Sequence, residues 1–370
     1  MVEDRVEARR RGAKGERDGG ADGAAATGEE GRLSSRAIEA ADPRRVYELY
    51  DGWPSDAEDA LRTRVDVPAR GYRRVVYLAV GGSATAGDII SDWFLSSGGV
   101  EVSVYRGNVP RMVLEDALVI VCSTSGDTEE TLQMARAVIG EHPHMVAISA
   151  GGRLRELAER EGIAHVKIKL SRAPRFTLPY SLFASIAALR SASLLEGMEW
   201  ELGETVATMK ALAREVDRRA PAQRNVSKRV AAFLAGGLPC IYATSVTKSV
   251  ARRFRNSLNE NAKMHASFST APDFLHNEVE AWEVPEPAMR PVVLRRVNDP
   301  APETRALGSF VQLLRSRRVP VSTVAGTGKG NLAQLMSLCY SLDVASYYAA
   351  ILRGVEPFEI NLIEELKQAR

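Results

Sequence analysis

Short apolar runs alternate with amphipathic stretches along most of this chain, beginning near residue 72. The first runs are each bounded by glycine or hydroxyl residues, which is typical of buried strands. They lie at residues 75–80, 117–122, 145–149 and 166–170. Segments with helical spacing follow most of them, so the pattern indicates β-α-β units and a parallel sheet.

The second half of the chain shows the same alternation after a helical stretch at residues 182–219. Further strands are expected at 238–244, 291–297 and 319–324, and helices at 304–316, 331–352 and 360–370. We therefore predict an α/β protein with two domains of similar size, at residues 34–205 and 215–370, the second including the last helix. The second domain is a candidate structural repeat of the first.

The N-terminal residues 1–33 have a different composition, rich in Arg, Glu, Asp, Gly and Ala, with little to bury. We predict a disordered tail there; a start codon assigned too far upstream would give the same pattern. No apolar stretch follows the early charges, so the segment does not resemble a signal peptide. No segment is expected to reach the apolar length that a membrane span needs.

Charge and cysteine content narrow the class of protein. Lys and Arg number 49 against 47 Asp and Glu, a net charge of +2, which argues against a dedicated nucleic-acid-binding protein. The three cysteines lack metal-site or disulfide spacing, and we expect them to be small buried residues in a reducing cytoplasm: Cys122, Cys240 and Cys339. His142 and His144 are separated by a proline and make a poor chelate, so no metal and no cofactor is predicted.

Two loops that follow predicted strands are rich in glycine and hydroxyl groups. Ligands of parallel α/β sheets bind beyond the carboxyl ends of the strands. Residues 81–87 read GGSATAG, and residues 123–128 read STSGDT. Hydroxyl groups around a glycine at a helix N-terminus suit a phosphate. Helix capping by Ser83, Asp127 or Thr128 is the alternative explanation, although one cap requires only one such group.

Two segments of the second domain offer acid–base chemistry. Residues 259–263 read NENAK and place Glu260 between two amides, where it could act as a general base or be a solvated loop acid. His276 lies beside large apolar residues, at an expected helix start. Both a structural and a catalytic role are open for this histidine.

Taken in order, these motifs resemble the bifunctional phosphoglucose/phosphomannose isomerases of archaea and some bacteria. The resemblance runs from about residue 40 to the end, and further motifs carry it: PR at 174–175, HNE at 276–278, GVEP at 354–357 and IEELK at 363–367. It implies two SIS domains, each with a flavodoxin-like parallel sheet flanked by helices. The active site would lie between them, in a cytoplasmic homodimer that binds neither nucleic acid nor membrane.

The resemblance also implies which residues bind the substrate, a hexose 6-phosphate. By motif position, the phosphate would be held by Ser123, Ser125 and Thr128. The sugar would contact Gly82 and Ser83.

Four further positions would carry the chemistry. Glu260 would move the proton between C1 and C2, and Arg175 would stabilise the enediolate. His276 of the partner subunit and Lys367 would assist ring opening. The expected reaction converts glucose 6-phosphate, and also mannose 6-phosphate, to fructose 6-phosphate.

Three positions depart from the family pattern. Thr124 replaces a usual tyrosine, Asp127 replaces a usual asparagine beside the phosphate, and Asn361 stands where a threonine or serine is expected for the mannose epimer. Two alternatives to the main hypothesis stay open: an isomerase of another sugar phosphate, and a non-catalytic sugar-phosphate sensor. A sensor would need the phosphate loop without the four residues of the chemistry.

Overall fold

The computed structural model describes residue 28 and residues 31–108, 114–141 and 144–369. Most of the predicted tail, residues 1–33, lies outside these ranges. At its end, the Arg32 side chain donates to the carbonyl of Leu352, and Leu33 is buried.

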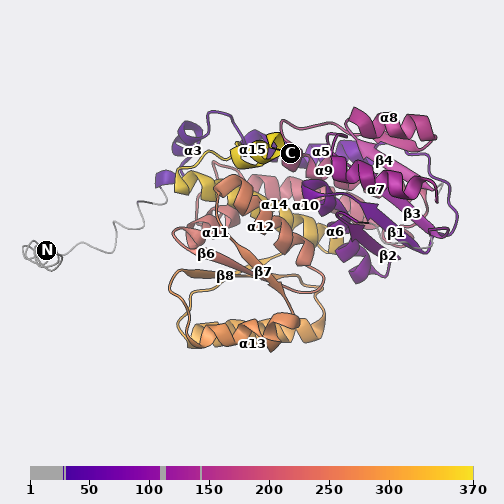
Figure 1. Cartoon of the computed structure of the whole chain (residues 1–370). Coiled ribbons are helices and arrows are strands. Elements are labelled where there is room, and N and C mark those ends of the chain that lie inside the picture. The colour runs from indigo at the N-terminus through magenta and orange to yellow at the C-terminus, as the bar shows by residue number, and fades with distance from the viewer. Residues whose placement is uncertain (1–27, 29–30, 109–113, 142–143, 370) are drawn as a thin grey trace, which may run out of the picture.

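The first sheet is parallel, with the strand order β2-β1-β3-β4-β5 within the described residues (Figure 1). Its strands are β1 (Arg74–Leu78), β2 (Glu101–Tyr105), β3 (Ala117–Cys122), β4 (Met145–Ser149) and β5 (Ala164–Lys167). This is the flavodoxin-like order, and it reverses between β1 and β3. The edge strand β2 was not predicted because it is mostly half-buried and lacks a continuous apolar run.

The second sheet is also parallel and has the order β7-β6-β8-β9 within the same part of the chain. Its strands are β6 (Leu238–Ala243), β7 (Ser267–Thr270), β8 (Met289–Arg295) and β9 (Ser322–Ala325). The order repeats that of β2-β1-β3-β4, so the second unit does repeat the first. The predicted α/β class, with two parallel sheets flanked by helices, is confirmed.

Helices surround and join the two sheets. The first half of the chain contributes α3 (Ser35–Ala41), α4 (Tyr47–Asp51), α5 (Trp53–Leu61), α6 (Gly81–Ser97), α7 (Glu129–Ile139), α8 (Gly152–Glu161), the 3-10 turn η1 (Pro174–Thr177), α9 (Leu178–Ser191) and α10 (Trp200–Val216). The second half contributes α11 (Val226–Leu234), α12 (Lys248–Ala262), the 3-10 turns η2 (Asp273–His276) and η3 (Glu278–Glu283), α13 (Ala301–Ser316), α14 (Asn331–Arg353) and α15 (Asn361–Gln368).

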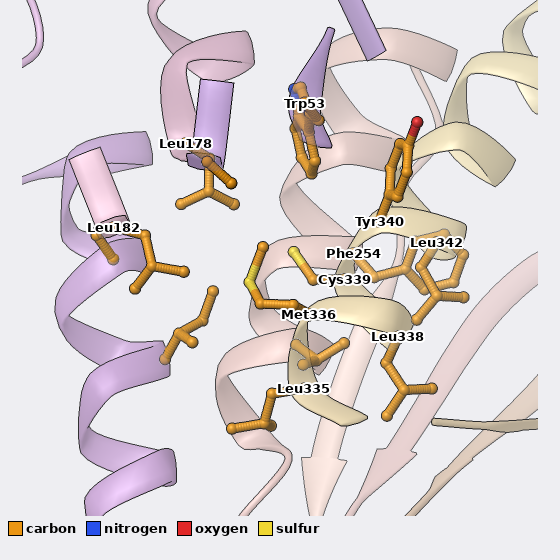
Figure 2. Close-up of a cluster of buried hydrophobic side chains, with 14 of the residues drawn as sticks. Trp53, Leu178, Leu182, Phe254, Leu335, Met336, Leu338, Cys339, Tyr340 and Leu342 are labelled. Carbon is orange, nitrogen blue, oxygen red and sulfur yellow. The ribbon is translucent and has the colours of Figure 1, made fainter. Parts of the chain in front are cut away.

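Helix α14 forms the centre of the molecule and packs against α10, α11 and α12. Figure 2 shows Met336 and Cys339 of α14 pointing toward Leu178 and Leu182 of α9. Within the described residues α14 is the one helix long and apolar enough to cross a membrane, so the expectation that no segment has this length was wrong. Its apolar stretch is entirely buried because other helices enclose it, which makes it a core helix.

One buried apolar cluster joins the two units, since it contains Val75 of β1 and Ile241 of β6 together with most of α14. The three cysteines are free and buried, as predicted. The core is therefore continuous between the sheets, and it fixes the loops of the first unit against the helices of the second.

Candidate active site

The hydroxyl-rich loop at residues 123–128 follows β3, at the point where the order of the first sheet reverses. Ser123 Oγ donates to Thr128 Oγ1 (2.9 Å) and accepts from the amide of Gly126 (3.2 Å). Gly126 has φ of +87°, and a Cβ added there would lie 1.8 Å from the carbonyl oxygen of Gly151. Only glycine fits this position, which lets the loop pack closely against the backbone of Gly151.

Helix capping does not explain these hydroxyl groups. The position before α7 is Thr128, whose side chain makes no capping hydrogen bond. The position before α6 is Val80, not Ser83, and it also has no side-chain cap. Both loops thus place hydroxyl groups at helix N-termini without using them as caps, as anion binding requires.

The carboxylate of Asp127 turns away from its own helix. Its Oδ1 accepts from the backbone amide of Arg153 (3.1 Å), in the first turn of α8, and lies 3.5 Å from the guanidinium of Arg153. The Arg153 guanidinium also donates to the Asp127 carbonyl (2.7 Å). This pairing offsets the negative charge, which weakens the repulsion that a phosphate in the loop would meet.

The glycine-rich turn at the start of α6 lies beside the hydroxyl-rich loop. Ser83 Oγ is 2.9 Å from Thr124 Oγ1 and accepts from the Thr124 amide (3.2 Å). Gly82 lies on the other side of this turn, where an added Cβ would be 3.8 Å from both Arg175 Cα and Arg253 Nη1. The two loops predicted to bind sugar and phosphate therefore meet each other and adjoin two arginines.

Arg175 lies in η1 and is only 5% exposed. Its Nε donates to Asn261 Oδ1 (3.0 Å), and its Nη2 donates to the carbonyls of Pro357 (3.1 Å) and Phe358. The guanidinium carbon lies 4.6 Å from the ring centroid of Phe176. Burial lowers the pKa of Arg175, but the side chain stays a cation at neutral pH. The guanidinium is thus a positive charge in a fixed position, while the backbone of Arg175 lies beside Gly82.

Glu260 lies in the last turn of α12 and is half-buried, so it is not a loop acid. Burial is the largest effect on the pKa of Arg175 and lowers it. The negative charge of Glu260 opposes this effect and raises that pKa. Arg253, on the same helix, donates to the Arg175 carbonyl (2.7 Å) and forms a buried ion pair with Asp343 of α14 (2.6 Å). Helices α12 and α14 together hold Arg175 near Glu260.

His276 does not lie near Glu260 within one chain. It ends the 3-10 turn η2 instead of beginning a helix, and it is exposed. Helix α12 begins at the carboxyl end of β6 and ends before β7, which is parallel to β6. Glu260 and His276 thus lie at opposite ends of the second sheet, and α12 alone is about 22 Å long.

Lys367 lies exposed on α15. This helix starts three residues after Phe358, which accepts a hydrogen bond from Arg175. Lys367 therefore lies on the helix that directly follows the segment bound by Arg175.

Several residues of this site were missed from sequence. Asn261 anchors Arg175, while Arg253 and Asp343 form the ion pair behind it. The ion pair could have been found from the sequence, because Asp343 is a charged residue in the middle of an otherwise apolar helical stretch. In the structure Asp343 is fully buried in α14.

No group of three or more His, Cys, Asp or Glu side chains that could hold a metal occurs in the part of the chain that the structure describes. His142, of the predicted poor chelate, lies outside that part.

Comparison with known proteins shows which proteins this chain is similar to. Residues 223–369 match the family model of the bacterial phospho-glucose isomerase C-terminal SIS domain. A bifunctional phosphoglucose/phosphomannose isomerase of Caldicellulosiruptor bescii is 29% identical, over 87% of this chain and 96% of its own length. One of Aquifex aeolicus is 28% identical, over 87% and 97% of the two chains. Over most of its length this chain is therefore similar to proteins named bifunctional phosphoglucose/phosphomannose isomerase.

The fold of this chain agrees with that of solved structures. A glucose-6-phosphate isomerase like protein from Thermus thermophilus superposes with a TM-score of 0.57 at 22% identity, covering 91% of this chain and 99% of that one. At this identity the likeness concerns the fold alone. The predicted pair of SIS domains is confirmed at that level.

Proposed function

We propose that this chain interconverts fructose 6-phosphate with glucose 6-phosphate and mannose 6-phosphate, without a metal, in the cytoplasm. One observation carries the proposal: the hydroxyl-rich loop of the first unit adjoins Gly82 and Arg175, while α12 of the second unit brings Glu260 to the same place. The names of the relatives from Caldicellulosiruptor and Aquifex support this choice of substrate.

The proposed mechanism moves one proton between the carbons C2 and C1 and one between the oxygens O2 and O1. With the phosphate held by Ser125 and Thr128, Glu260 removes the C2 proton of the open-chain aldose. The electron pair forms the C1–C2 double bond of an enediolate, whose negative charge is stabilised by the fixed guanidinium of Arg175. Return of the proton to C1, together with transfer of the O2 hydroxyl proton to O1, gives the ketose. The reverse sequence gives either aldose epimer, according to the face of C2 that receives the proton.

The proposed active unit is a homodimer. Ring opening by a histidine near Glu260 requires His276 of the partner subunit, because the chain's own histidine lies at the far end of the sheet. Helix α15 supports such an association, since it exposes three large apolar side chains: Leu362, Ile363 and Leu366.

The first experiment supplies fructose 6-phosphate to the EDTA-treated protein and follows both aldose phosphates. Appearance of glucose 6-phosphate and mannose 6-phosphate is the expected result. If only glucose 6-phosphate forms, the mannose activity is excluded, which would point to Asn361. If neither forms while a sugar phosphate still binds, the sensor hypothesis replaces the isomerase.

The role of Glu260 is tested by Glu260→Gln, which keeps the shape and removes the base. Turnover should fall by about 10²–10⁴-fold, with the affinity for a sugar-phosphate inhibitor retained. Glu215→Gln, on the exposed face of α10, is the matched control and should keep full turnover. Near-normal turnover of the Glu260 variant would remove this residue from the mechanism.

A further inference from the structure

The segment that joins α14 to α15, residues 356–360, is held by a lysine of another element; we call it the C-terminal strap. Lys263 Nζ donates to the carbonyl oxygens of Glu356 and Glu359 (2.8 Å for Glu359), and lies 3.4 Å from that of Asn261. Lys263 directly follows α12 and has a left-handed backbone, with φ of +51°. The residue that ends the helix of Glu260 is therefore tied to the strap.

The carboxylate of Glu356 fixes the strap from within. Its Oε2 accepts from the amides of Phe358 (3.0 Å) and Glu359 (2.6 Å). Its Oε1 is buried without a hydrogen-bond partner among the described residues. The charge of Glu356 raises the pKa of both Lys263 and Arg175, against the lowering that burial causes. The charge of this carboxylate thus favours the charged forms of both Lys263 and Arg175.

Arg175 holds the middle of the same strap, through the carbonyls of Pro357 and Phe358. The Phe358 ring stacks on Phe176, with centroids 6.2 Å apart and planes at 11°. The strap is therefore fixed by groups from both units, η1 of the first and α12 of the second.

Helix α15, by contrast, has little packing of its own. The side chains of residues 361–367 are all exposed. Its place relative to the site is set by the strap that precedes it.

We propose that Lys263 and Glu356 are positioning residues, which fix the strap so that α15 and Lys367 stay aligned with Glu260 and Arg175. This inference rests on the proposed isomerase function. The hydroxyl-rich loop proposed to bind the phosphate follows a strand of the first sheet. Among the described residues, the hydrogen bonds of Lys263 go to residues 261, 356 and 359 and not to this loop. Loss of the tether should consequently lower turnover and leave substrate binding nearly unchanged, since small misplacements act on the chemical step.

The test compares Lys263→Met with Lys263→Arg and with Lys210→Met, a control that removes the Lys210–Glu58 pair elsewhere on the surface. In Lys263→Met, kcat should fall about tenfold or more while KM for fructose 6-phosphate changes less than about twofold. Lys263→Arg should recover most of kcat, because a guanidinium can still donate to two carbonyls. Glu356→Gln should lower kcat in the same way, and Lys210→Met should not.

Hydrogen exchange supplies a readout that needs no turnover. The amides of residues 361–368 should exchange faster in Lys263→Met than in the wild type and in Lys210→Met. If the wild type isomerises no sugar phosphate, the proposed function fails. Hydrogen exchange alone then decides whether the bonds from Lys263 to the strap hold α15 in place.

Three results would overturn the inference. They are unchanged kcat and exchange in Lys263→Met, a loss of kcat that only reflects a smaller folded fraction, and a loss that Lys263→Arg does not recover. The last result would mean that the ammonium itself acts on the substrate.

Discussion

At the scale of single residues, the hydroxyl groups of the 123–128 loop have different surroundings. Ser123 is 1% exposed and is used within the loop, where it orients Thr128. Ser125 and Thr128 are half-buried and reach the edge of the site. A phosphate would therefore meet the side chains of Ser125 and Thr128 more directly than that of Ser123.

Thr128→Val removes one of these donors without changing the shape of the side chain. Hydrogen bonds to charged groups contribute about 1.5–3 kcal/mol, so KM for fructose 6-phosphate should rise roughly 10–100-fold. Thr131→Val is the matched control, three residues along the chain, since its buried hydroxyl has no hydrogen-bond partner among the described residues. Steady-state kinetics of both variants check the expectation; equal KM values would exclude a phosphate contact for Thr128.

At the scale of elements, α12 connects the chemistry to the fold, because it carries Arg253, Glu260 and Asn261 and ends at Lys263. Its N-terminus is capped from α6: Asp92 Oδ2 accepts from the Ser249 amide (2.8 Å). Asp92 is fully buried, and burial raises its pKa from 3.8 to about 6. The neighbouring charges are Lys248, which opposes this rise, and Asp88, which adds to it.

This cap makes the stability of the protein depend on pH. Because the pKa of Asp92 is higher in the folded state, the unfolded chain releases the proton first, and stability is lost as pH rises from about 4 through about 6. The difference between the two pKa values corresponds to about 3 kcal/mol. In Asp92→Asn this contribution should disappear.

Urea unfolding at several pH values measures the effect. Between pH 4 and 7 the unfolding free energy of Asp92→Asn should rise relative to that of the wild type, by up to about 3 kcal/mol. Asp66→Asn, at an exposed position, is the control and should follow the wild type. Parallel curves for Asp92→Asn and the wild type would show that Asp92 is not protonated on burial.

At the scale of the whole molecule, the two sheets share a strand order but differ at their carboxyl ends. In the second sheet, Glu303 accepts from both the amide (2.6 Å) and the hydroxyl (2.7 Å) of Ser245. Asp299 accepts from Thr244 Oγ1 (3.1 Å) and from the Arg296 amide (2.7 Å). The protein's own carboxylates occupy these donors, so this end of the second sheet does not resemble the hydroxyl-rich loop after β3. The proposed base, Glu260, comes from α12 instead.

The proposed homodimer is tested by complementation between two inactive variants. Glu260→Gln and His276→Ala should each lack activity, but a mixed dimer would retain one site with both residues intact. Random pairing of equal amounts should restore about a quarter of wild-type activity, since about half of the dimers are mixed and each has one working site. No recovery on mixing, with mixed dimers demonstrated by tagged copies, would exclude a histidine shared across the interface.

Local sequence patterns were sufficient to predict the buried strands, the two loops and the candidate residues of the chemistry. Apolar runs predicted the buried strands, because burial on both faces leaves a continuous pattern. The edge strands β2 and β7 are mostly half-buried, so they have no continuous apolar pattern and were missed. Glycine and hydroxyl residues after β1 and β3 marked the loops, because a ligand at the carboxyl ends of strands requires them.

Which of these residues contact one another depends on how the elements pack. Asn261 and Arg175 are in contact although they are 86 positions apart in the sequence. Lys263 and Glu359 are in contact although they are 96 positions apart. Glu260 and His276 are 16 positions apart, yet the crossing of α12 sends them to opposite ends of a sheet. Sequence patterns report the period of one element, whereas distances between elements depend on how the buried faces pack, which no local pattern contains.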